Sequence, residues 1–458
     1  MKEQRKRKFL DVEQFIEELK ADVDIGAEIV HHEVIPAQEA KYSDWGQLPP
    51  VLSKALTAYG VEQPYEHQAF ALNLIEQGKD VAAITPTASG KSLIYAVPVL
   101  KRVLTENKAR ALFVFPLKAL EQDQLRMLQE LCAEAGLPET SCAIMDGDTP
   151  QAARKKLKAN PPSILLTTPD MLHFGILPFH SQWEELFKNL HFIVLDELHT
   201  YRGVFGSHVA QLLRRLARMA EHYGSKPQWI TCSATIANPG EFAESLVGRP
   251  FSVVDKNSAP RAARHFLFIN PEQRTTTRAA NLLTRAIDST LRTIVFTKAR
   301  KITELVSQWV CESRQDLAKK ISSYRSGYLP EERREIEQSL STGKLLGVVS
   351  TSALEMGIDI GGLDVCVLIG YPGTIASTWQ RGGRVGRGER SSLVIMLAGA
   401  DALDQYFMKH PHDFFARGAE AAVVDPDNEP ILEAHLPCAA AELPLLDGDK
   451  YLRPQDRE

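Results

Sequence analysis

The chain has 458 residues, of which 44% are hydrophobic and 24% are charged, so its length and composition predict a globular protein of two to four domains. The formal net charge of −5 excludes nucleic-acid binding through a chain-wide excess of positive charge and leaves a local basic lining as the alternative. No apolar run approaches the length of a membrane span, and the six cysteines include no Cys-x-x-Cys pair, so neither a disulfide framework nor a zinc site is indicated. We expect a cytoplasmic protein with reduced thiols and no membrane partner.

The first 50 residues are expected to be a lead-in segment. Apolar residues at helical spacing predict one short amphipathic helix around residues 12–19, and residues 42–50 are expected to form a loop. His31 and His32 lie between these segments. Since no second pair of metal ligands stands nearby in the sequence, the two histidines are interpreted as part of a solvated turn.

From residue 51 onward, short apolar runs alternate with helical stretches, a pattern typical of parallel sheets covered by helices on both faces. A change in composition at residues 255–262 predicts a hinge between two such domains, 51–254 and 263–420, and residues 421–458 are expected to form an appendage. The expected strands are 81–84, 111–115, 163–167, 192–195 and 229–232, then 293–296, 319–322, 347–350, 365–369 and 393–397. The expected helices are 66–77, 92–105, 118–135, 150–158 and 207–222, then 276–290, 300–312, 330–341 and 376–384.

Residues 80–92 combine a buried strand, a turn of small residues and the start of a helix. This order is typical of a phosphate-binding loop, in which backbone N–H groups and a helix N-terminus hold phosphate oxygens. Lys91 is expected to reach the β- and γ-phosphates of ATP, and the Ser92 hydroxyl is expected to bind Mg²⁺. The residues expected around the phosphates are Thr85, Thr87, Ala88, Ser89, Gly90, Lys91 and Ser92, with Thr85 at a position where the pattern has glycine. Taken alone, a plain helix N-terminus is the alternative interpretation of this segment.

Two carboxylates follow the fourth expected strand, at the end where parallel sheets place their sites. ATP hydrolysis needs such a pair, so Asp196 is expected to hold Mg²⁺ and Glu197 to orient the attacking water. Ser233 and Thr235 close the fifth expected strand. Together with His199 they are candidates for coupling the phosphate site to a nucleic-acid site. An exposed acidic turn and a satisfied polar turn are the alternative interpretations of these two segments.

Residues 380–387 contain three arginines at intervals of three residues among glycines, and the last two are Arg384 and Arg387. A guanidinium presents a fixed fork to phosphate oxygens, and an arginine from a second domain can stabilise the charge that develops on a transferring phosphoryl group. Gln380, Arg384 and Arg387 are therefore predicted to be catalytic when the domains close. A flexible basic loop on nucleic acid is the alternative.

In order and spacing, these segments resemble the motifs of superfamily 2 helicases of the Asp-Glu-x-His type over about residues 60–400. The resemblance implies an α/β fold of two tandem RecA-like parallel-sheet domains, with ATP and Mg²⁺ in the cleft between them, and an ATP-hydrolysing helicase. By resemblance, Tyr65 and Gln68 form the adenine-reading motif, and Gly357 and Asp359 belong to a further ATP-binding motif. The other motif residues are expected to contact nucleic acid, mainly at its phosphates: Pro116, Lys118, Thr168, Pro169, Asp170, Thr297, Arg300 and Thr351.

A narrower resemblance is to the bacterial MrfA-type mitomycin-repair helicases and their fungal RecQ-related relatives, carried by residues 201–208, 324–334, 370–380 and 431–443. It implies an ATP-dependent 3′-to-5′ DNA helicase that acts on single-stranded and forked duplex DNA in the repair of crosslinks or bulky adducts, with a repair nuclease as a candidate partner. Those relatives continue into a domain with a four-cysteine zinc site. This sequence ends with Cys438 as the only cysteine of its tail, so we expect no zinc here and either a piece of a longer protein or a short form.

Aromatic residues beside the motifs have two interpretations each. Tyr201 and Phe205 follow the acidic pair and are expected either to stack on a base or to pack in the core. Trp379 is expected to pack in the core beside the arginine-bearing turn, and stacking on a base is the alternative. Tyr324 and Arg325 are expected either to contact a phosphate or to form a surface turn.

Three functions remain open from the sequence. The main interpretation is a monomeric DNA-dependent ATPase that moves along a single strand and unwinds duplex DNA. An RNA helicase of the same fold would differ by contacts to the 2′-hydroxyl. A non-catalytic nucleic-acid clamp with a degenerate ATP site is the third, favoured by Thr85 and Ala88 in place of loop glycines and opposed by the complete set of charged motif residues.

Overall fold

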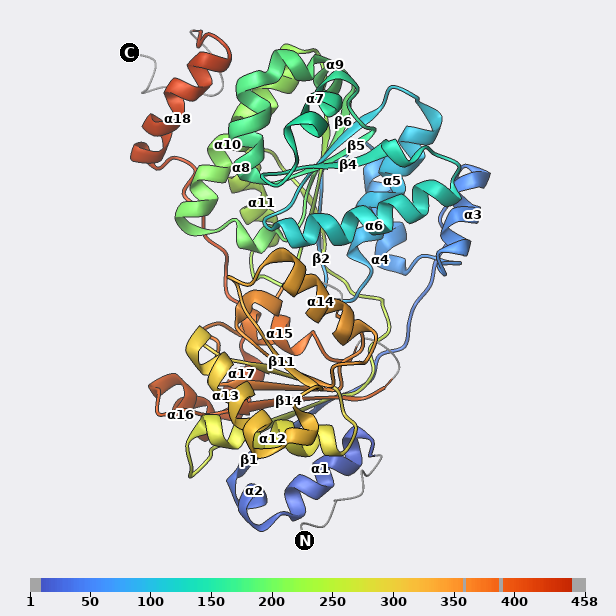
Figure 1. Cartoon of the computed structure of the whole chain (residues 1–458). Coiled ribbons are helices and arrows are strands. Elements are labelled where there is room, and N and C mark those ends of the chain that lie inside the picture. Colours follow the sequence, from blue (N-terminus) through green and yellow to red (C-terminus); the bar gives the residue numbers. More distant parts are fainter. Residues whose placement is uncertain (1–9, 357–359, 387–389, 447–458) are drawn as a thin grey trace. The chain divides into compact units, whose positions relative to one another are not determined.

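The computed structural model describes residues 10–356, 360–386 and 390–446 (Figure 1). The chain forms two compact units: unit 1 consists of Met1–Ala40 and Ala259–Glu420, and unit 2 of Lys41–Ser258 and Ala421–Glu458. The passage between Ser258 and Ala259 falls within the expected hinge. Residues 1–40, part of the expected lead-in segment 1–50, belong to unit 1, and residues 421–446 belong to unit 2.

Two of the passages between the units run side by side as antiparallel segments. Gln38 and Arg261 exchange backbone hydrogen bonds of 2.8 and 2.9 Å, both within unit 1. The Lys41 N–H donates to the Ser258 carbonyl oxygen at 2.9 Å, within unit 2. The hinge is therefore a paired connection rather than a single linker.

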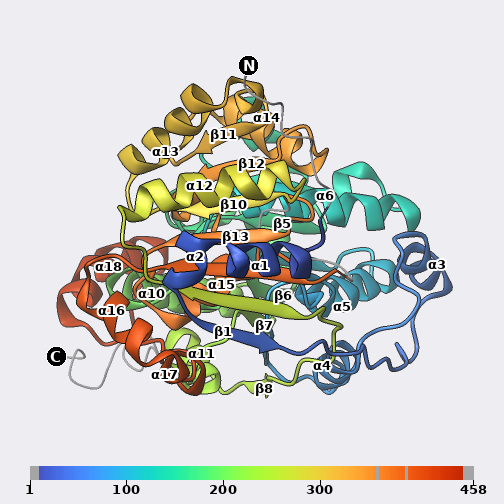
Figure 2. The same cartoon turned by 90° about the horizontal axis from the view of Figure 1, so that it is seen from below.

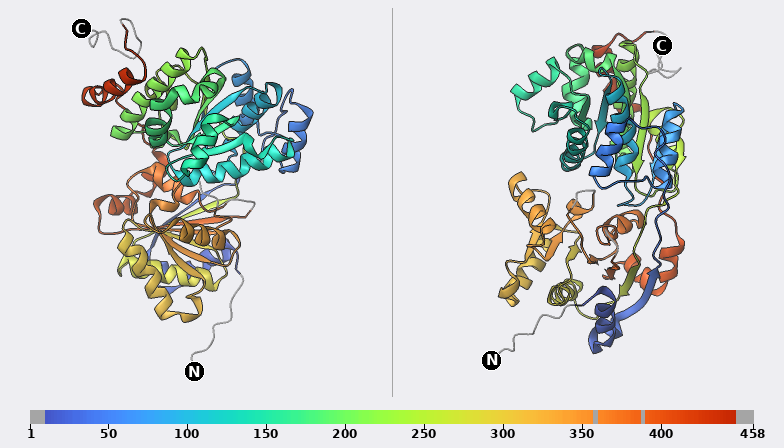
Figure 3. Two further views of the ribbon diagram at one scale, coloured as in Figure 1. Left: turned by 45° about the horizontal axis from the view of Figure 1, so that its top comes forward. Right: turned by 90° about the vertical axis from the view of Figure 1, so that its right-hand side faces the viewer.

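Unit 2 is built on a seven-stranded sheet in the order β4-β5-β3-β6-β7-β2-β8, in which neighbouring strands pair in parallel. Helices lie over both faces (Figure 3), which explains why its central strands are continuous apolar runs. The strands are β2 Val81–Ile84, β3 Arg110–Val114, β4 Cys142–Met145, β5 Ile164–Thr167, β6 Leu190–Leu195, β7 Gln228–Ser233 and β8 Ser252–Val254. The helices are α3 Pro50–Ala58, α4 Glu66–Glu76, α5 Lys91–Thr105, α6 Lys118–Glu134, α7 Gln151–Ala159, α8 Pro169–Met171, α9 Glu184–Lys188, α10 Gly203–His222, α11 Pro239–Val247 and α18 Glu429–Glu442.

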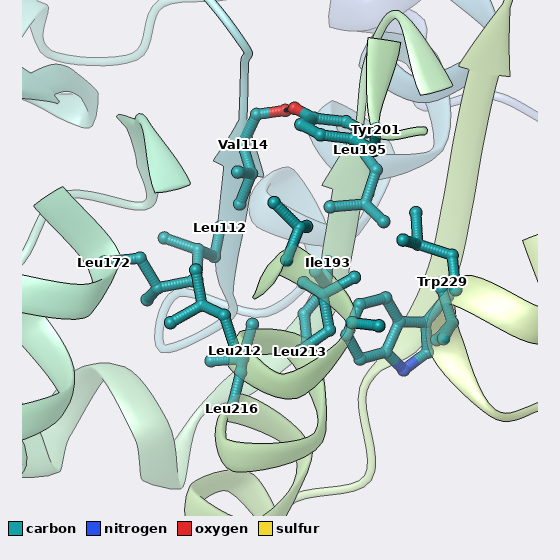
Figure 4. Packing of buried hydrophobic residues seen from close by; sticks show 14 of the residues in the cluster. Leu112, Val114, Leu172, Ile193, Leu195, Tyr201, Leu212, Leu213, Leu216 and Trp229 are labelled. Carbon is teal, nitrogen blue, oxygen red and sulfur yellow. Dashed lines mark hydrogen bonds between the residues drawn. The ribbon is translucent and has the colours of Figure 1, made fainter. Parts of the chain in front are cut away.

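Much of the core of unit 2 lies between α10 and the sheet (Figure 4). Leu112, Ile193 and Trp229 come from three neighbouring strands and meet Leu212 and Leu216 of α10. Each is almost completely buried, and burial of one such side chain contributes about 1.5–3 kcal/mol to folding. This packing holds β3, β6 and β7 in place against α10. It thereby positions the polar residues that follow the carboxyl ends of these strands.

Unit 1 is also built on a seven-stranded sheet, in the order β1-β9-β14-β13-β10-β12-β11. Its strands pair in parallel except at the β1 edge, where β1 runs antiparallel to β9. The strands are β1 Ile29–Ile35, β9 Arg264–Ile269, β10 Thr293–Phe296, β11 Ile321–Tyr324, β12 Gly347–Ser350, β13 Val365–Ile369 and β14 Ser392–Leu397. The helices are α1 Val12–Ala21, α2 Val23–Glu28, α12 Thr275–Asp288, α13 Arg300–Ser313, α14 Pro330–Ser341, α15 Ile375–Gly382, α16 Ala402–Lys409 and α17 Pro411–Ala416.

Strand β9 presents different side chains to the two faces of this sheet. Leu267 and Ile269 join the core formed with α1, α12 and α13, and Figure 2 shows α1 and α12 on that face. Phe266 lies on the opposite face, where its ring packs against those of Trp379 and Phe414 at 5.8 and 5.3 Å between centroids. The prediction that Trp379 packs beside the arginine-bearing turn is therefore confirmed.

All ten expected strands are present, and the two parallel-sheet α/β domains are confirmed, although β11 begins two residues later than expected. The sequence interpretation missed β1, β4, β8 and β9. The solvated turn assigned to His31 and His32 is wrong, because both residues lie in β1. Within the ranges that the structure describes, no helix combines the length and the apolar character needed to cross a membrane.

Candidate active site and nucleic-acid edge

The phosphate-binding loop joins β2 to α5, as the sequence predicts for residues 85–90. Gly90 precedes the helix with a φ of 74°, and a Cβ at this position would lie 2.5 Å from Nε2 of Gln68. Only glycine therefore fits there without displacing Gln68. Thr85, which stands in place of a loop glycine, lies with its Oγ1 2.6 Å from Oγ of Ser89, so the two hydroxyls bridge the base of the loop.

The segment 65–68 packs directly against this loop. The Gln68 side chain accepts from the Tyr65 N–H at 2.9 Å and donates to the Gly90 carbonyl oxygen at 2.9 Å. His67, which the sequence interpretation did not single out, lies with Nε2 3.0 Å from the Ser89 carbonyl oxygen and Nδ1 2.8 Å from Oγ of Ser258. These contacts hold the backbone of the loop at Ser89 and Gly90. The adenine-reading role of Tyr65 and Gln68 stays a prediction.

The acidic pair lies beyond the end of β6, close to the phosphate-binding loop. Tyr95, one turn after Ser92 on α5, donates a 3.1 Å hydrogen bond from its hydroxyl to Oδ2 of Asp196. Burial, followed by the neighbouring Glu197 carboxylate, raises the pKa of Asp196 to about 7, and the Lys91 ammonium opposes that shift. Nζ of Lys91 donates to the Ser233 carbonyl oxygen at 3.2 Å. The predicted lysine and carboxylates are thus brought together.

Backbone strain concentrates in this region. Of the three described non-glycine residues with positive φ, two belong to it: Ala88 at 63° and Glu197 at 50°. Side chains other than glycine adopt this conformation at a cost of about 1–2 kcal/mol. In Ala88 the loop keeps the left-handed turn that a glycine would adopt freely, so the missing glycine does not remove the turn.

His199 connects the acidic pair to the end of β7. Its Nδ1 lies 3.5 Å from Oε2 of Glu197 and 3.2 Å from Oγ of Ser233, whose hydroxyl also accepts from the His199 N–H at 3.2 Å. Two of the three predicted coupling residues, His199 and Ser233, therefore contact each other, and His199 also contacts the carboxylate expected to orient water. Thr235, the third, is exposed.

The donor set at this site fits Mg²⁺. The Ser92 hydroxyl and the Asp196 carboxylate are hard oxygen ligands, the type that Mg²⁺ prefers. The Asp196 carboxylate is buried next to the Glu197 carboxylate, and a divalent cation there would offset the negative charge of the pair. Mg²⁺ at these oxygens would neutralise charge on the phosphates of ATP during hydrolysis.

In unit 1, the predicted arginine-bearing segment lies on α15 and the turn after it. Arg384 is buried, and its Nε and Nη2 donate to the Glu355 carbonyl oxygen at 3.1 and 2.8 Å. Arg381 forms an ion pair with the Glu355 carboxylate at 2.9 Å. Gln380 is buried on the same helix. Arg387, Gly357 and Asp359 lie outside the described residues, and the catalytic roles of this segment stay predictions.

The motif residues of unit 2 divide between two halves of one sheet edge, the carboxyl edge at which the parallel strands end. The ATP motifs follow β6, β7 and β2, which are adjacent in the sheet. Pro116 and Lys118 follow β3, and Thr168, Pro169 and Asp170 follow β5, its neighbour. Lys118 is exposed and pairs with Asp148 at 2.8 Å. The sheet thus separates a nucleotide half from a half that carries the expected nucleic-acid residues.

Unit 1 presents a comparable edge at the adjacent strands β10, β12 and β11. Thr297 follows β10 and is buried, with Oγ1 2.7 Å from that of Thr303, whereas Thr351 follows β12 and caps the next turn. Arg300 is exposed and donates to Oγ of Ser326 at 3.2 Å, and Arg325 forms an ion pair with Glu304 at 2.8 Å.

Two of the expected nucleic-acid residues are corrected by their burial. Tyr324 is 1% exposed and donates from its hydroxyl to Glu337 at 2.6 Å, so its side chain is not available to a phosphate. Tyr201 is completely buried in the core of unit 2, with its hydroxyl 3.4 Å from the Val114 carbonyl oxygen (Figure 4). Base stacking by Tyr201 is therefore wrong for this structure, and core packing is correct. Phe205 is 45% exposed and remains a stacking candidate.

Because Tyr201 is buried and Phe205 is exposed, alanine substitutions at the two positions are expected to affect different properties, stability and activity. Tyr201→Ala is expected to lower the free energy of unfolding by about 3–5 kcal/mol, because it leaves a cavity in the core. Phe205→Ala is expected to leave stability almost unchanged and to weaken the stimulation of ATP hydrolysis by single-stranded nucleic acid. Urea unfolding and steady-state ATP hydrolysis would measure the two effects. The assignment of Tyr201 to the core and Phe205 to base stacking would be contradicted by two results together. These are a stable Tyr201→Ala variant with reduced stimulation and a Phe205→Ala variant with unchanged stimulation.

Two family models match the chain: DEAD/DEAH box helicase over residues 65–242 and helicase conserved C-terminal domain over residues 278–389. The chain is 44% identical over 446 residues to the "Uncharacterized ATP-dependent helicase YprA" of Bacillus subtilis (strain 168), covering 95% of this chain and 59% of that protein. It is 37% identical over 464 residues to the ATP-dependent helicase hrq1 of Schizosaccharomyces pombe, covering 96% of this chain and 43% of that protein.

A crystal structure of the DUF1998 helicase MrfA bound to DNA and AMPPNP matches with a TM-score of 0.89 and 44% identity, covering 95% of this chain and 62% of that one. The chain thus spans between 43% and 62% of the length of these three relatives. The order of the motifs along two parallel-sheet domains agrees with both family models. The chain therefore belongs to the superfamily 2 helicases of the MrfA and Hrq1 type.

Proposed function

We propose that this chain is the motor of a DNA helicase, which hydrolyses ATP to move along single-stranded DNA as a monomer. The observation that carries the proposal is its similarity over nearly its whole length to MrfA, whose crystal structure contains DNA and AMPPNP. The division of the carboxyl edge of unit 2 into a nucleotide half and a polar half agrees with this function. A 3′-to-5′ direction and a role in the repair of crosslinks or bulky adducts on forked DNA, with a repair nuclease as partner, follow from the family resemblance alone.

The described residues have distinct roles in this proposal. Lys91 would move from the Ser233 carbonyl oxygen to the phosphates of ATP, and Glu197 would orient and deprotonate the attacking water. Ser92 and Asp196 would hold Mg²⁺. Because His199 contacts both Glu197 and Ser233, a change at the phosphates would reach the end of β7. Arg384 and Arg387 would act on the transferring phosphoryl group from the second domain.

ATP hydrolysis with no nucleic acid, with single-stranded DNA and with RNA of matched sequence, at one stated salt concentration, tests the proposal. We expect strong stimulation by DNA alone, and a Glu197→Gln variant that binds ATP without turnover. Partial duplexes with a 3′ or a 5′ single-stranded overhang then test the direction of unwinding. Equal stimulation by RNA would favour an RNA helicase, and nucleotide binding without turnover in the unmodified chain would favour a clamp.

A further inference from the structure

A cluster of metal-ligating side chains lies on unit 1, at the edge strand β1. His31 and Glu33 stand two residues apart on this strand, and alternation along a strand places both on one face of the sheet. Nε2 of His31 lies 3.0 Å from Oε2 of Glu33. The ring of His412, on α17, lies 5.0 Å from that of His31 between centroids. The cluster therefore joins two segments that are far apart in the sequence.

The cluster is held in place by an aromatic core beneath it. His31 pairs with Phe268 across the sheet and packs against its ring at 5.9 Å between centroids. Helix α17 is fixed by Phe414, which is completely buried, and by Phe415, whose ring lies 6.1 Å from that of His31. The side chain of His31 is 16% exposed, whereas His412 is exposed. His31 is thus fixed within the fold, whereas the exposed side chain of His412 is free to rotate.

We propose that His31, Glu33 and His412 bind one divalent transition-metal ion of the Zn²⁺, Co²⁺ or Ni²⁺ class. One potential ligand atom from each side chain lies within 4.8 Å of the other two. Around Zn²⁺ with bonds of about 2.0–2.2 Å, tetrahedral ligands are about 3.3–3.6 Å apart, so a small rotation of the His412 ring closes the site. Within the described parts of the chain, no other group of three or more His, Cys, Asp or Glu residues meets this criterion.

The ligand set selects the class of ion. Two imidazoles and one carboxylate suit borderline transition metals, whereas Mg²⁺ and Ca²⁺ prefer a shell of oxygens. Three protein ligands leave at least one coordination position for water or for a ligand from another molecule. The ion would tie the edge strand β1 to α17. The site differs from the four-cysteine zinc site implied by the family resemblance, and it does not depend on the proposed ATPase.

The opposite face of β1 provides a matched control. Nε2 of His32 lies 3.0 Å from Nδ1 of His265, and Nε2 of His265 lies 3.5 Å from Oε1 of Glu13. Here His265 uses its two ring nitrogens in opposite directions, so the three side chains form a chain of contacts and do not converge on one point. His32→Ala therefore removes a histidine from the same strand without removing a proposed ligand.

The test is metal titration of the full chain, without a histidine tag and after treatment with a chelator, in competition with a chromophoric Zn²⁺ chelator. We expect one equivalent of Zn²⁺ to bind, with affinity reduced at least about tenfold in His31→Ala, Glu33→Gln and His412→Ala and unchanged in His32→Ala. Zn²⁺ is expected to raise the thermal unfolding midpoint of the unmodified chain. The visible spectrum of bound Co²⁺ would report a site of low coordination number.

His412→Ala is the decisive variant because His412 is exposed and its loss is not expected to unfold the chain. A thermal unfolding scan without metal checks this point. His410→Ala removes a second histidine near α17, one whose ring packs on Tyr406 at 4.9 Å, and is expected to leave Zn²⁺ affinity unchanged. Equal affinities in the unmodified chain and in a folded His412→Ala variant, or an equal loss in His32→Ala, would overturn the proposal.

Discussion

Replacing Lys91 with alanine is expected to lower the maximal rate of DNA-stimulated ATP hydrolysis by about 10²–10³-fold or more. Lys91 is the first residue of α5, and its ammonium lies among Ser233, Asp196 and the phosphate-binding loop. The substitution removes the positive charge expected to stabilise the β- and γ-phosphates, whereas the strand and helix on either side are held by apolar packing. Steady-state hydrolysis at saturating ATP and single-stranded DNA would measure the effect.

Lys101→Ala is a matched control for this variant. Lys101 lies on the same helix and forms an ion pair with Glu76 away from the phosphate-binding loop. Its removal is expected to leave the rate within about twofold, because exposed ion pairs contribute about 0–1 kcal/mol. An undiminished rate in Lys91→Ala, in a variant with an unchanged thermal unfolding midpoint, would reject the phosphate-binding loop assignment.

Replacing Glu442 with alanine is expected to lower the free energy of unfolding by about 3–5 kcal/mol and to detach α18. Arg215 on α10 is completely buried and forms an ion pair with Glu442 at the end of α18, with Nε 2.9 Å from Oε2. Its Nη1 also lies 2.8 Å from Nδ1 of His173 and 3.2 Å from Nδ1 of His435. Glu442→Ala leaves a buried guanidinium without its carboxylate. Urea unfolding followed by tryptophan fluorescence would report it, since Trp183 and Trp229 are buried in unit 2.

A double substitution separates the loss of the ion pair from the loss of packing. Arg215→Met combined with Glu442→Leu removes both charges and keeps apolar volume, so it is expected to be more stable than Glu442→Ala alone. Glu433→Ala, on an exposed position of α18, is expected to change stability by no more than about 0.5 kcal/mol. If Glu442→Ala changed the free energy of unfolding as little as Glu433→Ala, the buried ion pair between Arg215 and Glu442 would not hold α18 in place.

The sequence predicts the central strands well because they are continuous apolar runs. Residues 81–84, 293–296, 347–350 and 365–369 coincide with β2, β10, β12 and β13. The missed strand β1 contains two histidines and a glutamate. Its polar side chains form contacts on both faces of an edge strand, one within β1 and one with His265 of β9. Strand β4 is four residues long and is identified by its pairing with β5, a contact that spacing along the chain does not reveal.

The residues of the candidate site also fall into those that the sequence can predict and those that it cannot. Residues adjacent in sequence to a predicted strand end, such as Lys91, Asp196 and Glu197, could be predicted because parallel strands align their carboxyl ends. Tyr95 and His67 could not, since their roles depend on which side chain the fold places opposite them. Tyr201 was ambiguous because the pattern of a loop does not fix the direction of a ring, and the packing of α10 against the sheet determines it.

The paired connection at residues 38–41 and 258–261 limits how this chain can be divided. A protease that cleaves once within residues 255–262 would leave the two units covalently joined through residues 40–41 and 420–421. A fragment that begins at residue 263 would lack β1, and the backbone of β9 would become an open sheet edge, a surface prone to intermolecular pairing. Expression of unit 1 alone therefore requires residues 1–40 either to be supplied as a separate peptide or to be fused ahead of residue 259, with residues 41–258 deleted.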